Sequence, residues 1–302
     1  MTTPVGLAIV GAGRMGVTHA EALRDEPSVR VNAIVDPSET ARQKALAAAP
    51  GAAAFAGLDA ALAGGGIEAV LIAAPSPLHL SLVEACAVHR LPILCEKPCG
   101  TTAAEARAAA AAADAAGCPL QIGYWRRFAP GLRSLRERIL AGELGELTLV
   151  SCYQWDGEPP TPEFRASSGG VAVDMGVHEL DQLRWLTGQE LGPFAAAAQP
   201  PEGAGPEGLQ LLGAMSGGTA AFVSLGQSFP HGDCVWVEVF GTAGHALERV
   251  LWGDGGDEAF RVALRAQARA FAERIETGAA GDAATANDAL IALEAAEELG
   301  RS

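Results

Sequence analysis

The sequence predicts an α/β protein in two parts: a doubly wound parallel sheet at the N-terminus and an antiparallel sheet after it. Three observations predict this fold. Short apolar runs alternate with amphipathic, Ala-rich stretches up to about residue 122, a glycine-rich turn follows the first run, and strand-like runs separated by turn residues dominate the region after 188. At about 150 residues per domain, the 302 residues accommodate two domains.

The N-terminal part is expected to contain five parallel strands joined by crossover helices. The apolar runs that predict the strands are 5–10, 29–35, 69–74, 92–95 and 119–123. The stretches between them are long enough for helices on both faces of the sheet, with right-handed connections. The stretch 103–116 is almost pure alanine with spaced charges, which favours a helix because alanine has the highest helix propensity.

The pattern changes after Gly123, where we place the boundary between a domain at 1–122 and a domain at 123–302. We expect the C-terminal helices to pack back on the first domain. Helices are predicted at 129–141, 173–186 and 259–299, the last broken near 277–284, and strands at 146–155, 209–215, 219–227 and 235–241. The segments 157–170 and 199–208 are rich in glycine and proline and are predicted to be loops.

Composition excludes several classes of function. Apolar residues make up 49% of the chain and charged residues 19%, which suits folded domains rather than disorder. The formal charge of −15 argues against nucleic-acid binding, which needs a basic face. No run of apolar residues is long enough to span a membrane, and the first residues predict a strand rather than a signal peptide.

The six cysteines form no CxxC pair, so we expect reduced thiols, a cytoplasmic location and no metal site. Cys95 and Cys99 together with distant histidines would be the only metal-site alternative, and no second ligand pair has zinc spacing.

The first candidate site is the turn Gly11-Ala12-Gly13-Arg14-Met15-Gly16, a GxGxxG motif between a predicted strand and a predicted helix. In such a strand-to-helix turn the first glycine permits the tight turn, the second lets a pyrophosphate approach the backbone, and the third lets helix and strand pack closely. The helix N-terminus then presents N–H groups to the phosphates. A glycine-rich turn without a ligand is the alternative.

Asp36 lies at the end of the second strand, 20 residues after Gly16. A carboxylate there can accept hydrogen bonds from the adenosine ribose and repels a 2′-phosphate, so the sequence favours NAD over NADP. An ordinary turn residue before Pro37 is the alternative interpretation.

Two further turns follow buried strands at the edge where such sheets bind ligands. Residues 73–77, Ala-Ala-Pro-Ser-Pro, are expected to flank the nicotinamide, with His79 either contacting the cofactor or only capping the next helix. Glu96 and Lys97 follow the run 92–95. A charged pair directly after a buried strand is unfavourable unless it is solvated or used, so Lys97 is a candidate for the reacting hydroxyl, and a surface ion pair is the alternative.

A polar stripe marks the predicted helix at 173–186. Asp174, His178 and Asp181 are spaced i, i+4 and i+7 and therefore share one helical face. A carboxylate one turn before a histidine can orient the ring as a base for a hydroxyl proton, although a solvated helix face has the same pattern. Arg126 and Arg127 lie near the domain boundary, where one can bind cofactor or substrate; we favour Arg127 for the substrate.

In this order and spacing, the pieces resemble the glucose–fructose oxidoreductase/inositol dehydrogenase/MocA (Gfo/Idh/MocA) family over nearly the whole chain. The resemblance rests on GAGRMG at 11–16, Asp36, Glu96-Lys97-Pro98, GYWRRF at 123–128, and Gly169-Gly170 followed by DMGVHELDQLRWLTG at 174–188. It implies an N-terminal Rossmann domain, a C-terminal α/β domain with an open, mainly antiparallel sheet, and homodimers or homotetramers formed through that sheet.

The resemblance and the motifs together assign the site residues. The expected catalytic residues are Lys97, Asp174 and His178, and the expected substrate contacts are Arg127, Trp155 and Asp181. The expected cofactor contacts are Gly11, Ala12, Gly13, Arg14, Met15, Gly16, Asp36, Ala74, Pro75, Ser76, His79, Glu96, Lys97 and Arg126.

The function predicted from these assignments is NAD-dependent oxidation of a secondary alcohol of a cyclic polyol or sugar, or reduction of the matching ketone. His178 is expected to take the hydroxyl proton, Asp174 to orient its ring and Lys97 to stabilise the alkoxide-like oxygen. The alternatives are a glycosidase that uses NAD for transient oxidation, and a non-catalytic sensor of NAD or sugar. The intact Lys97, Asp174 and His178 set argues against the sensor.

Overall fold

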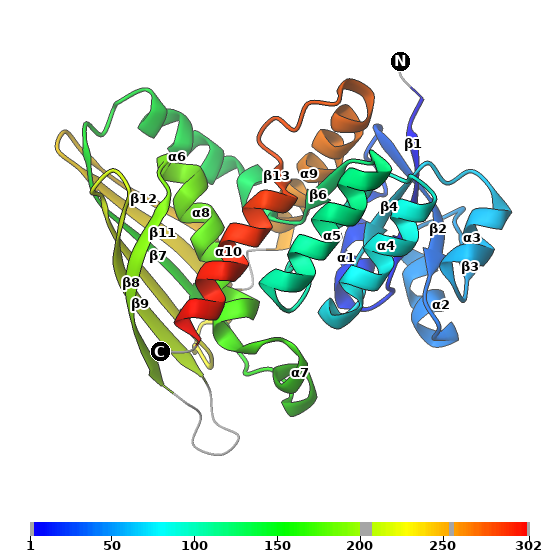
Figure 1. Cartoon of the computed structure of the whole chain (residues 1–302), viewed down its shortest axis with the longest axis horizontal. Helices are drawn as coiled ribbons and strands as arrows, with labels where there is room; N and C mark the ends of the chain where they lie inside the picture. The colour runs from blue at the N-terminus through cyan, green and yellow to red at the C-terminus, as the bar shows by residue number, and fades with distance from the viewer. Residues whose placement is uncertain (1–2, 200–206, 254–256, 301–302) are drawn as a thin grey trace. The chain divides into compact units, whose positions relative to one another are not determined.

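The computed structural model describes residues 3–199, 207–253 and 257–300 (Figure 1). The chain divides into two compact units. Unit 1 comprises residues 1–125 and 261–290, and unit 2 comprises residues 126–260 and 291–302. Each unit is built around its own β-sheet.

Unit 1 contains a seven-stranded sheet in the order β13-β6-β5-β4-β1-β2-β3. All neighbouring strands are parallel except β13, which runs antiparallel to β6. Strand order reverses between β1 and β4, and in such sheets ligands bind beyond the carboxyl ends of the strands at this reversal. The strands are β1 Val5–Val10, β2 Val29–Val35, β3 Ala53–Phe55, β4 Ala69–Ile72, β5 Ile93–Cys95, β6 Leu120–Ile122 and β13 Ala284–Thr285.

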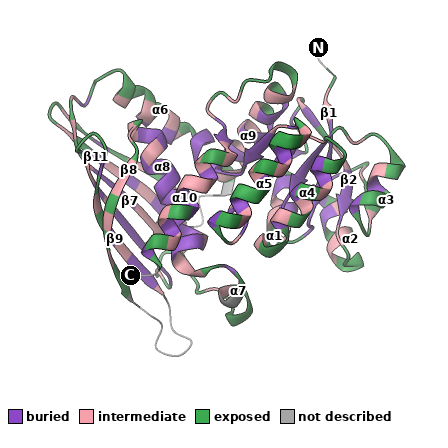
Figure 2. Ribbon diagram, in the orientation of Figure 1, coloured by how far each residue is buried: buried purple, intermediate pink, exposed green. Residues whose placement is uncertain are grey.

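Helices cover both faces of this sheet, as Figure 2 shows by the buried strands between them. Leu7 and Ile9 of β1 belong to a buried cluster with side chains of α1, α2 and α9, while α4 and α5 pack together and α4 contacts β4 and β5. Both faces of the central strands are therefore buried, as their continuous apolar runs predict. The helices are α1 Arg14–Leu23, α2 Glu39–Ala48, α3 Leu58–Gly64, α4 His79–Val88, α5 Ala103–Ala116, α9 Asp257–Thr277 and α10 Ala286–Leu299, with a 3₁₀ turn at Ser76–Leu78; α9 and α10 each extend into unit 2.

Unit 2 contains a six-stranded sheet in the order β12-β11-β7-β10-β9-β8. All neighbours are antiparallel except β10 and β7, which are parallel, so the sheet is mixed. The strands are β7 Leu147–Trp155, β8 Leu191–Gln199, β9 Gly208–Met215, β10 Ala220–Gly226, β11 Cys234–Gly241 and β12 His245–Trp252.

One face of this second sheet is buried under helices. Val150, Val223 and Val237 are fully buried on that face, and α8 contacts β7 while α6 contacts α8 (Figures 1 and 2). The period of two along each strand places the alternate side chains on the opposite face. The helices are α6 Pro130–Leu140, α7 Pro162–Ser167 and α8 Val177–Thr187, with a 3₁₀ turn at Trp125–Phe128 and a π-helical turn at Ala172–Gly176 directly before α8.

The structure confirms the fold class and adds elements that the sequence analysis missed. The segment 157–170 was predicted to be a loop, but it contains α7, which begins where the Thr161 hydroxyl accepts a hydrogen bond from the Phe164 N–H and Pro162 takes the first helical position. Strands β3, β8, β12 and β13 were not predicted. Most of the predicted loop at 199–208 lies outside the described residues.

Candidate active site

The turn between β1 and α1 has the geometry that its three glycines predict. Gly11 has a φ of +99°, and a Cβ there would lie 2.5 Å from the backbone N of Ala74. A Cβ on Gly16 would lie 1.9 Å from the Gly11 carbonyl oxygen, so the helix can approach the strand only without a side chain. A Cβ on Gly13 would meet nothing within 4 Å. The backbone at Gly13 therefore faces open space large enough for a ligand to approach.

The N-terminus of α1 is left open to such a ligand. Gly13 occupies the N-cap position, and no side chain accepts a hydrogen bond from the first turn. Gly13 and Arg14 are exposed, Met15 is partly exposed, and Gly11, Ala12 and Gly16 are buried. Free N–H groups at a helix N-terminus favour an anion, and this turn fits the pyrophosphate of a dinucleotide.

Asp36 lies beside this turn, at the carboxyl end of β2. Its Oδ2 accepts a hydrogen bond from the Ala12 N–H at 2.8 Å, and its Oδ1 accepts one from the Ser38 N–H at 2.8 Å. The two bonds fix the carboxylate next to the glycine-rich turn while the residue stays partly exposed. A fixed, accessible carboxylate in this place suits the two hydroxyls of an adenosine ribose.

His79, the first residue of α4, is 1% exposed and joins two of the loops at the carboxyl edge of the sheet. Its Nδ1 lies 2.7 Å from the Pro98 carbonyl oxygen, and its Nε2 lies 2.7 Å from the Ala74 carbonyl oxygen. Burial lowers the pKa of His79, and the hydrogen bonds with Pro98 and Ala74 oppose that shift. Both ring nitrogens thus contact backbone of unit 1. Nearby, Ala74 and Ser76 are partly exposed and Pro75 is exposed.

Glu96 and Lys97 form the turn after β5, and the peptide bond between Lys97 and Pro98 is cis. Glu96 is buried, with Oε1 2.7 Å from Nε2 of His19 and Oε2 accepting the Lys97 N–H at 3.2 Å. Lys97 itself is partly exposed. Contacts within unit 1 therefore fix the backbone of this turn, while the Lys97 side chain remains accessible to solvent.

Two buried ion pairs in unit 2 connect the segment 126–127 to α8. Arg127 donates from Nε to Asp181 Oδ2 at 2.9 Å and from a terminal nitrogen to Oδ1 at 2.5 Å. Arg126 forms an ion pair with Glu179, whose side chain is fully buried, and donates a second hydrogen bond to Gln154 at 2.7 Å. The Arg127–Asp181 contact is bidentate and therefore geometrically specific, and together with the Arg126–Glu179 pair it fixes the register of α8 against the start of unit 2.

Asp174 and His178 lie on consecutive turns at the start of this helical segment. Asp174 belongs to the π-helical turn and is partly exposed, whereas His178 is the second residue of α8 and is 6% exposed. Single π-helical turns within helices are rare and occur often at functional sites. Trp155 ends β7, and its indole N–H donates to Ser224 at 3.1 Å.

The predicted residues thus form one group in each unit. Unit 1 gathers the glycine-rich turn, Asp36, the loop at 74–76, His79 and the Lys97 turn at one edge of its sheet, and unit 2 gathers Arg126, Arg127, Asp174, His178 and Asp181 around α8.

Sequence analysis missed three residues that take part in these groups: His19, Glu179 and Gln154. Glu179 lies between His178 and the stripe residue Asp181, and no sequence pattern distinguishes it from the other polar residues of α8. His19 lies on the helix that follows the glycine-rich turn, and nothing in its neighbours in sequence points to Glu96.

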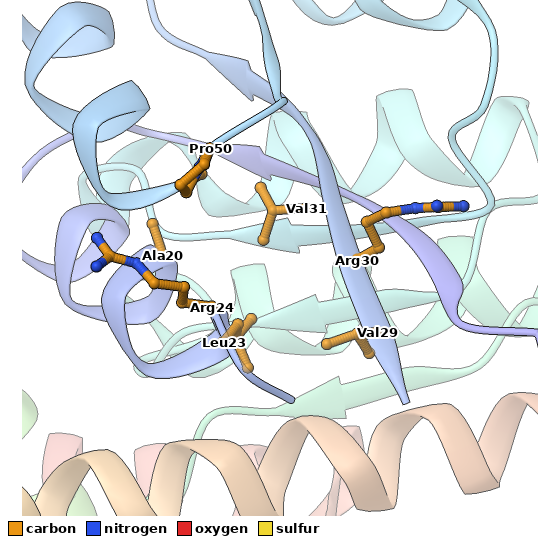
Figure 3. Close-up of a pocket in the computed structure, with 8 residues that line it drawn as sticks. Ala20, Leu23, Arg24, Val29, Arg30, Val31 and Pro50 are labelled. Atoms are coloured by element: carbon orange, nitrogen blue, oxygen red, sulfur yellow. The ribbon is translucent and has the colours of Figure 1, made fainter. Parts of the chain in front are cut away.

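Figure 3 shows a pocket of about 90 Å³ in unit 1, lined by Leu23, Arg24, Val29 and Val31 among others. It lies at the start of β2, away from Asp36 at the end of that strand, and contains none of the predicted site residues. Within the described ranges, no three His, Cys, Asp or Glu side chains are grouped to hold a metal ion. Among the helices that the structure describes, none has the length and apolarity to cross a membrane.

Comparison with known proteins identifies the family. Residues 5–124 match the model of an oxidoreductase family with an NAD-binding Rossmann fold, and residues 132–247 match the GFO/IDH/MocA C-terminal domain. The rhizopine catabolism protein MocA of Rhizobium meliloti is 47% identical over 296 residues, which cover 96% of this chain and 92% of that protein. The chain belongs to the Gfo/Idh/MocA oxidoreductase family.

Two further relatives of this Gfo/Idh/MocA protein are described as inositol dehydrogenases. Myo-inositol dehydrogenase Hyg17 of Streptomyces leeuwenhoekii is 34% identical over 316 residues, 96% of each chain. The crystal structure of a putative myo-inositol dehydrogenase from Sinorhizobium meliloti 1021 superimposes with a TM-score of 0.90, at 28% identity and covering 99% of this chain and 97% of that one.

Family membership confirms the predicted enzyme class and cofactor. This Gfo/Idh/MocA protein is an NAD-dependent oxidoreductase that acts on CH–OH groups, and the glycine-rich turn and Asp36 have the geometry that an NAD site requires.

Proposed function

We propose that the protein interconverts a secondary alcohol and a ketone on the ring of a cyclic polyol or sugar. The observation that carries this proposal is the helical segment with Asp174 and His178 on consecutive turns, fixed by the bidentate bond between Arg127 and Asp181. Support for the substrate class comes from the relatives described as inositol dehydrogenases. A histidine held in place beside a carboxylate is suited to take a hydroxyl proton.

Each polar residue has a definite task in this proposal. NAD, when bound, supplies the nicotinamide ring that accepts the hydride. His178 takes the proton of the substrate hydroxyl, Asp174 orients its imidazole, and Lys97 stabilises the negative charge that develops on the oxygen. In the reverse direction His178 returns the proton as the ketone is reduced.

We assign substrate binding to Arg127, Trp155 and Asp181. The Arg127–Asp181 pair brings N–H donors and carboxylate oxygens together in one bidentate contact, and a ring hydroxyl can bond to either kind of group. Neighbouring ring hydroxyls, each both donor and acceptor, match such a pair. Trp155, at the end of β7 and partly exposed, supplies an apolar surface for the C–H face of a ring.

Around the cofactor, we assign the pyrophosphate to the turn 11–16 and the adenosine ribose to Asp36. The nicotinamide side is assigned to Ala74, Pro75, Ser76, Glu96, Lys97 and Arg126. His79 belongs to the same edge, where its two ring nitrogens lie 2.7 Å from the carbonyl oxygens of Pro98 and Ala74. A cytoplasmic location is part of the proposal, because all six cysteines are buried and free of disulfides.

We expect Asp36→Asn to weaken NAD binding by about tenfold to a hundredfold, since hydrogen bonds to a charged group contribute about 1.5–3 kcal/mol. Binding of NADP is expected to weaken less or to improve, because the substitution removes repulsion of the 2′-phosphate. Titration of protein fluorescence with each dinucleotide measures both affinities. Equal losses for NAD and NADP would contradict the role of Asp36 in discrimination.

A substrate panel tests the proposed reaction. The protein is incubated with NAD or NADP and each of a set of inositols, aldopyranoses and amino-sugars, and NADH absorbance is followed. We expect NADH to accumulate with a subset of cyclic polyols. Cleavage of a glycoside without accumulation of NADH would instead indicate the redox-assisted glycosidase, and binding without turnover would indicate a sensor.

We propose that the protein forms a homodimer or homotetramer through the outer face of the unit 2 sheet. Tyr153 stacks on Trp236 with ring centroids 4.4 Å apart, and Trp236 contacts Trp252 at 5.7 Å. Leu212, Leu247 and Trp252 are 60%, 47% and 42% exposed. An exposed apolar face of this kind is typical of an interface.

Introducing charge on this face is expected to dissociate the assembly. The double variant Leu247→Glu/Trp252→Glu should sediment as a monomer where the wild-type protein sediments as a dimer or tetramer. Leu140→Glu, a matched change at a leucine 61% exposed on α6, should leave the sedimentation coefficient unchanged. A monomeric wild-type protein would contradict the proposed interface.

A further inference from the structure

The turn that carries Lys97 is held by a buried histidine on each side. Glu96, which precedes Lys97, contacts His19 of α1, and Pro98, which follows it, contacts His79 of α4. Both histidines are 1% exposed, and both contacts measure 2.7 Å. In the proposed reaction His178 takes the proton of the substrate, so His19 and His79 are not needed for that step. Their buried contacts with this turn therefore have another function.

His19 acts on the turn through the carboxylate of Glu96. Oε1 of Glu96 meets Nε2 of His19, and Oε2 accepts the backbone N–H of Lys97 at 3.2 Å. The carboxylate therefore links the ring of His19 directly to the backbone of Lys97. Gly123 makes room for it, since a Cβ there would lie 3.0 Å from Glu96 Oε1. His19 also lies on α1, whose N-terminus forms the phosphate turn, so one helix joins the cofactor turn to the lysine turn.

His79 acts on the other side through backbone alone. A neutral imidazole carries one N–H, so it can donate to the Pro98 or the Ala74 carbonyl but not to both. The contact with Pro98 is fully buried, whereas that with Ala74 is partly exposed. A carbonyl oxygen without a hydrogen bond is more unfavourable where water has no access to it, as at Pro98. We therefore assign the proton to Nδ1 of His79, which faces the Pro98 carbonyl.

We infer that His19 and His79 are positioning residues that together fix the Lys97 turn for reaction, His19 through Nε2 and Glu96, and His79 through Nδ1 and Pro98. The inference rests on the proposed role of Lys97. Since reacting groups must be held in near-attack geometry, displacement of the turn by a fraction of an ångström lowers kcat more than it lowers affinity for NAD or substrate.

Amide substitutions test each contact separately. The amide nitrogen of asparagine is three bonds from Cα, like Nδ1 of histidine, and that of glutamine is four bonds away, like Nε2. The inference therefore predicts that kcat is higher for asparagine than for glutamine at position 79, and higher for glutamine than for asparagine at position 19. His79→Asn and His19→Gln are expected to keep kcat within about threefold of wild type. His79→Gln and His19→Asn, like the leucine variants His79→Leu and His19→Leu, are expected to lower kcat by about tenfold to a hundredfold.

The measurements are kcat, the KM for the polyol and the dissociation constant for NAD, with kcat normalised to the fraction of protein that binds NAD. We expect KM and NAD affinity to change much less than kcat. Val83→Ala and Leu23→Ala, at buried residues of α4 and α1, serve as matched controls that lower the melting temperature without lowering normalised kcat.

The outcomes separate this inference from the proposed function. If Lys97→Ala abolishes turnover while the leucine variants at 19 and 79 keep wild-type normalised kcat, the positioning role is wrong and the proposed function stands. The same order of asparagine and glutamine at both positions would also overturn the inference. If Lys97→Ala turns over at the wild-type rate, the role of Lys97 on which this inference rests is wrong, whereas the reaction itself is tested by the substrate panel.

Discussion

Replacing Lys97 or His178 with alanine is expected to lower kcat by about a hundredfold to ten-thousandfold, the range typical of lost proton transfer to or from a positioned side chain. His178→Ala removes the group that takes the hydroxyl proton. Lys97→Ala removes the positive charge that stabilises the oxygen as that proton leaves. NAD affinity should change little, because the phosphate turn and Asp36 provide the contacts proposed for the rest of the cofactor.

The chain offers a matched control for each variant. Lys44 is the other lysine of the sequence and lies on α2, and His89 is an exposed histidine just after α4. Lys44→Ala and His89→Ala should keep wild-type kcat. Steady-state rates with NAD and the preferred polyol, together with NAD titration of each variant, measure the effect. Wild-type rates in both Lys97→Ala and His178→Ala would contradict the assigned roles.

Loss of Arg126 is expected to be among the most destabilising single changes in unit 2. Arg126 and Glu179 are paired with side-chain exposures of 4% and 0%, so Arg126→Met leaves a carboxylate buried without its counter-charge. Breaking a buried pair from one side costs about 3–5 kcal/mol of unfolding free energy. Gln182 still donates to Glu179 at 3.1 Å, but a neutral amide does not replace the lost charge.

Urea denaturation measures the free energy of unfolding of the wild type, Arg126→Met, Arg126→Met/Glu179→Leu and Arg138→Met. We expect Arg126→Met to be strongly destabilised and Arg126→Met/Glu179→Leu to recover much of the loss, because the double variant leaves no unpaired buried charge. Arg138→Met breaks an exposed pair, with side chains 43% and 55% exposed, and should change the free energy of unfolding by less than about 1 kcal/mol. If Arg126→Met and Arg138→Met lowered the free energy of unfolding by similar amounts, burial of the Arg126–Glu179 pair would not explain the loss.

Much of the fold could be predicted because local pattern and tertiary structure agree. The strand β1 (VGLAIV) is a continuous apolar run, β2 (VRVNAIV) ends in one, and the helix α5 has Thr102 as its N-cap and Gly117 as its C-cap. The elements that were missed depend on partners distant in sequence. The strand β8 reads LGPFAAAAQ, whose alanines favour a helix, and it is extended because it pairs with β9 at the sheet edge.

In the unit 2 sheet, too, pairing between segments distant in sequence could not be predicted. Consecutive strands predicted an antiparallel meander, and β9 and β10 do pair in this way. The parallel pairing of β10 with β7 joins segments about 70 residues apart, and no local pattern reports it. Strand β12 was missed because its charged residues interrupt the apolar alternation.

The candidate site could be predicted where a motif fixes residues close together in sequence. The glycine-rich turn is of this kind, and its glycines have the geometry that the motif predicts. The shared face of the stripe at 174–181 stays a prediction, since His178 and Asp181 lie on α8 whereas Asp174 lies in the π-helical turn before it. The contacts between distant residues could not be foreseen. His19 and Glu96 are 77 positions apart, and Arg127 and Asp181 are 54 apart, so only the folded chain shows that they pair.

The central claim is that a ring carbon of a cyclic polyol and the nicotinamide of NAD exchange a hydride on this protein, and isotope transfer tests it most directly. The best substrate of the panel is prepared with deuterium on the reacting carbon and incubated with NAD and the protein. The account predicts that deuterium appears on the reduced cofactor, one atom for each ring ketone formed. Ketone formation or glycoside cleavage that leaves no deuterium on the cofactor would contradict it.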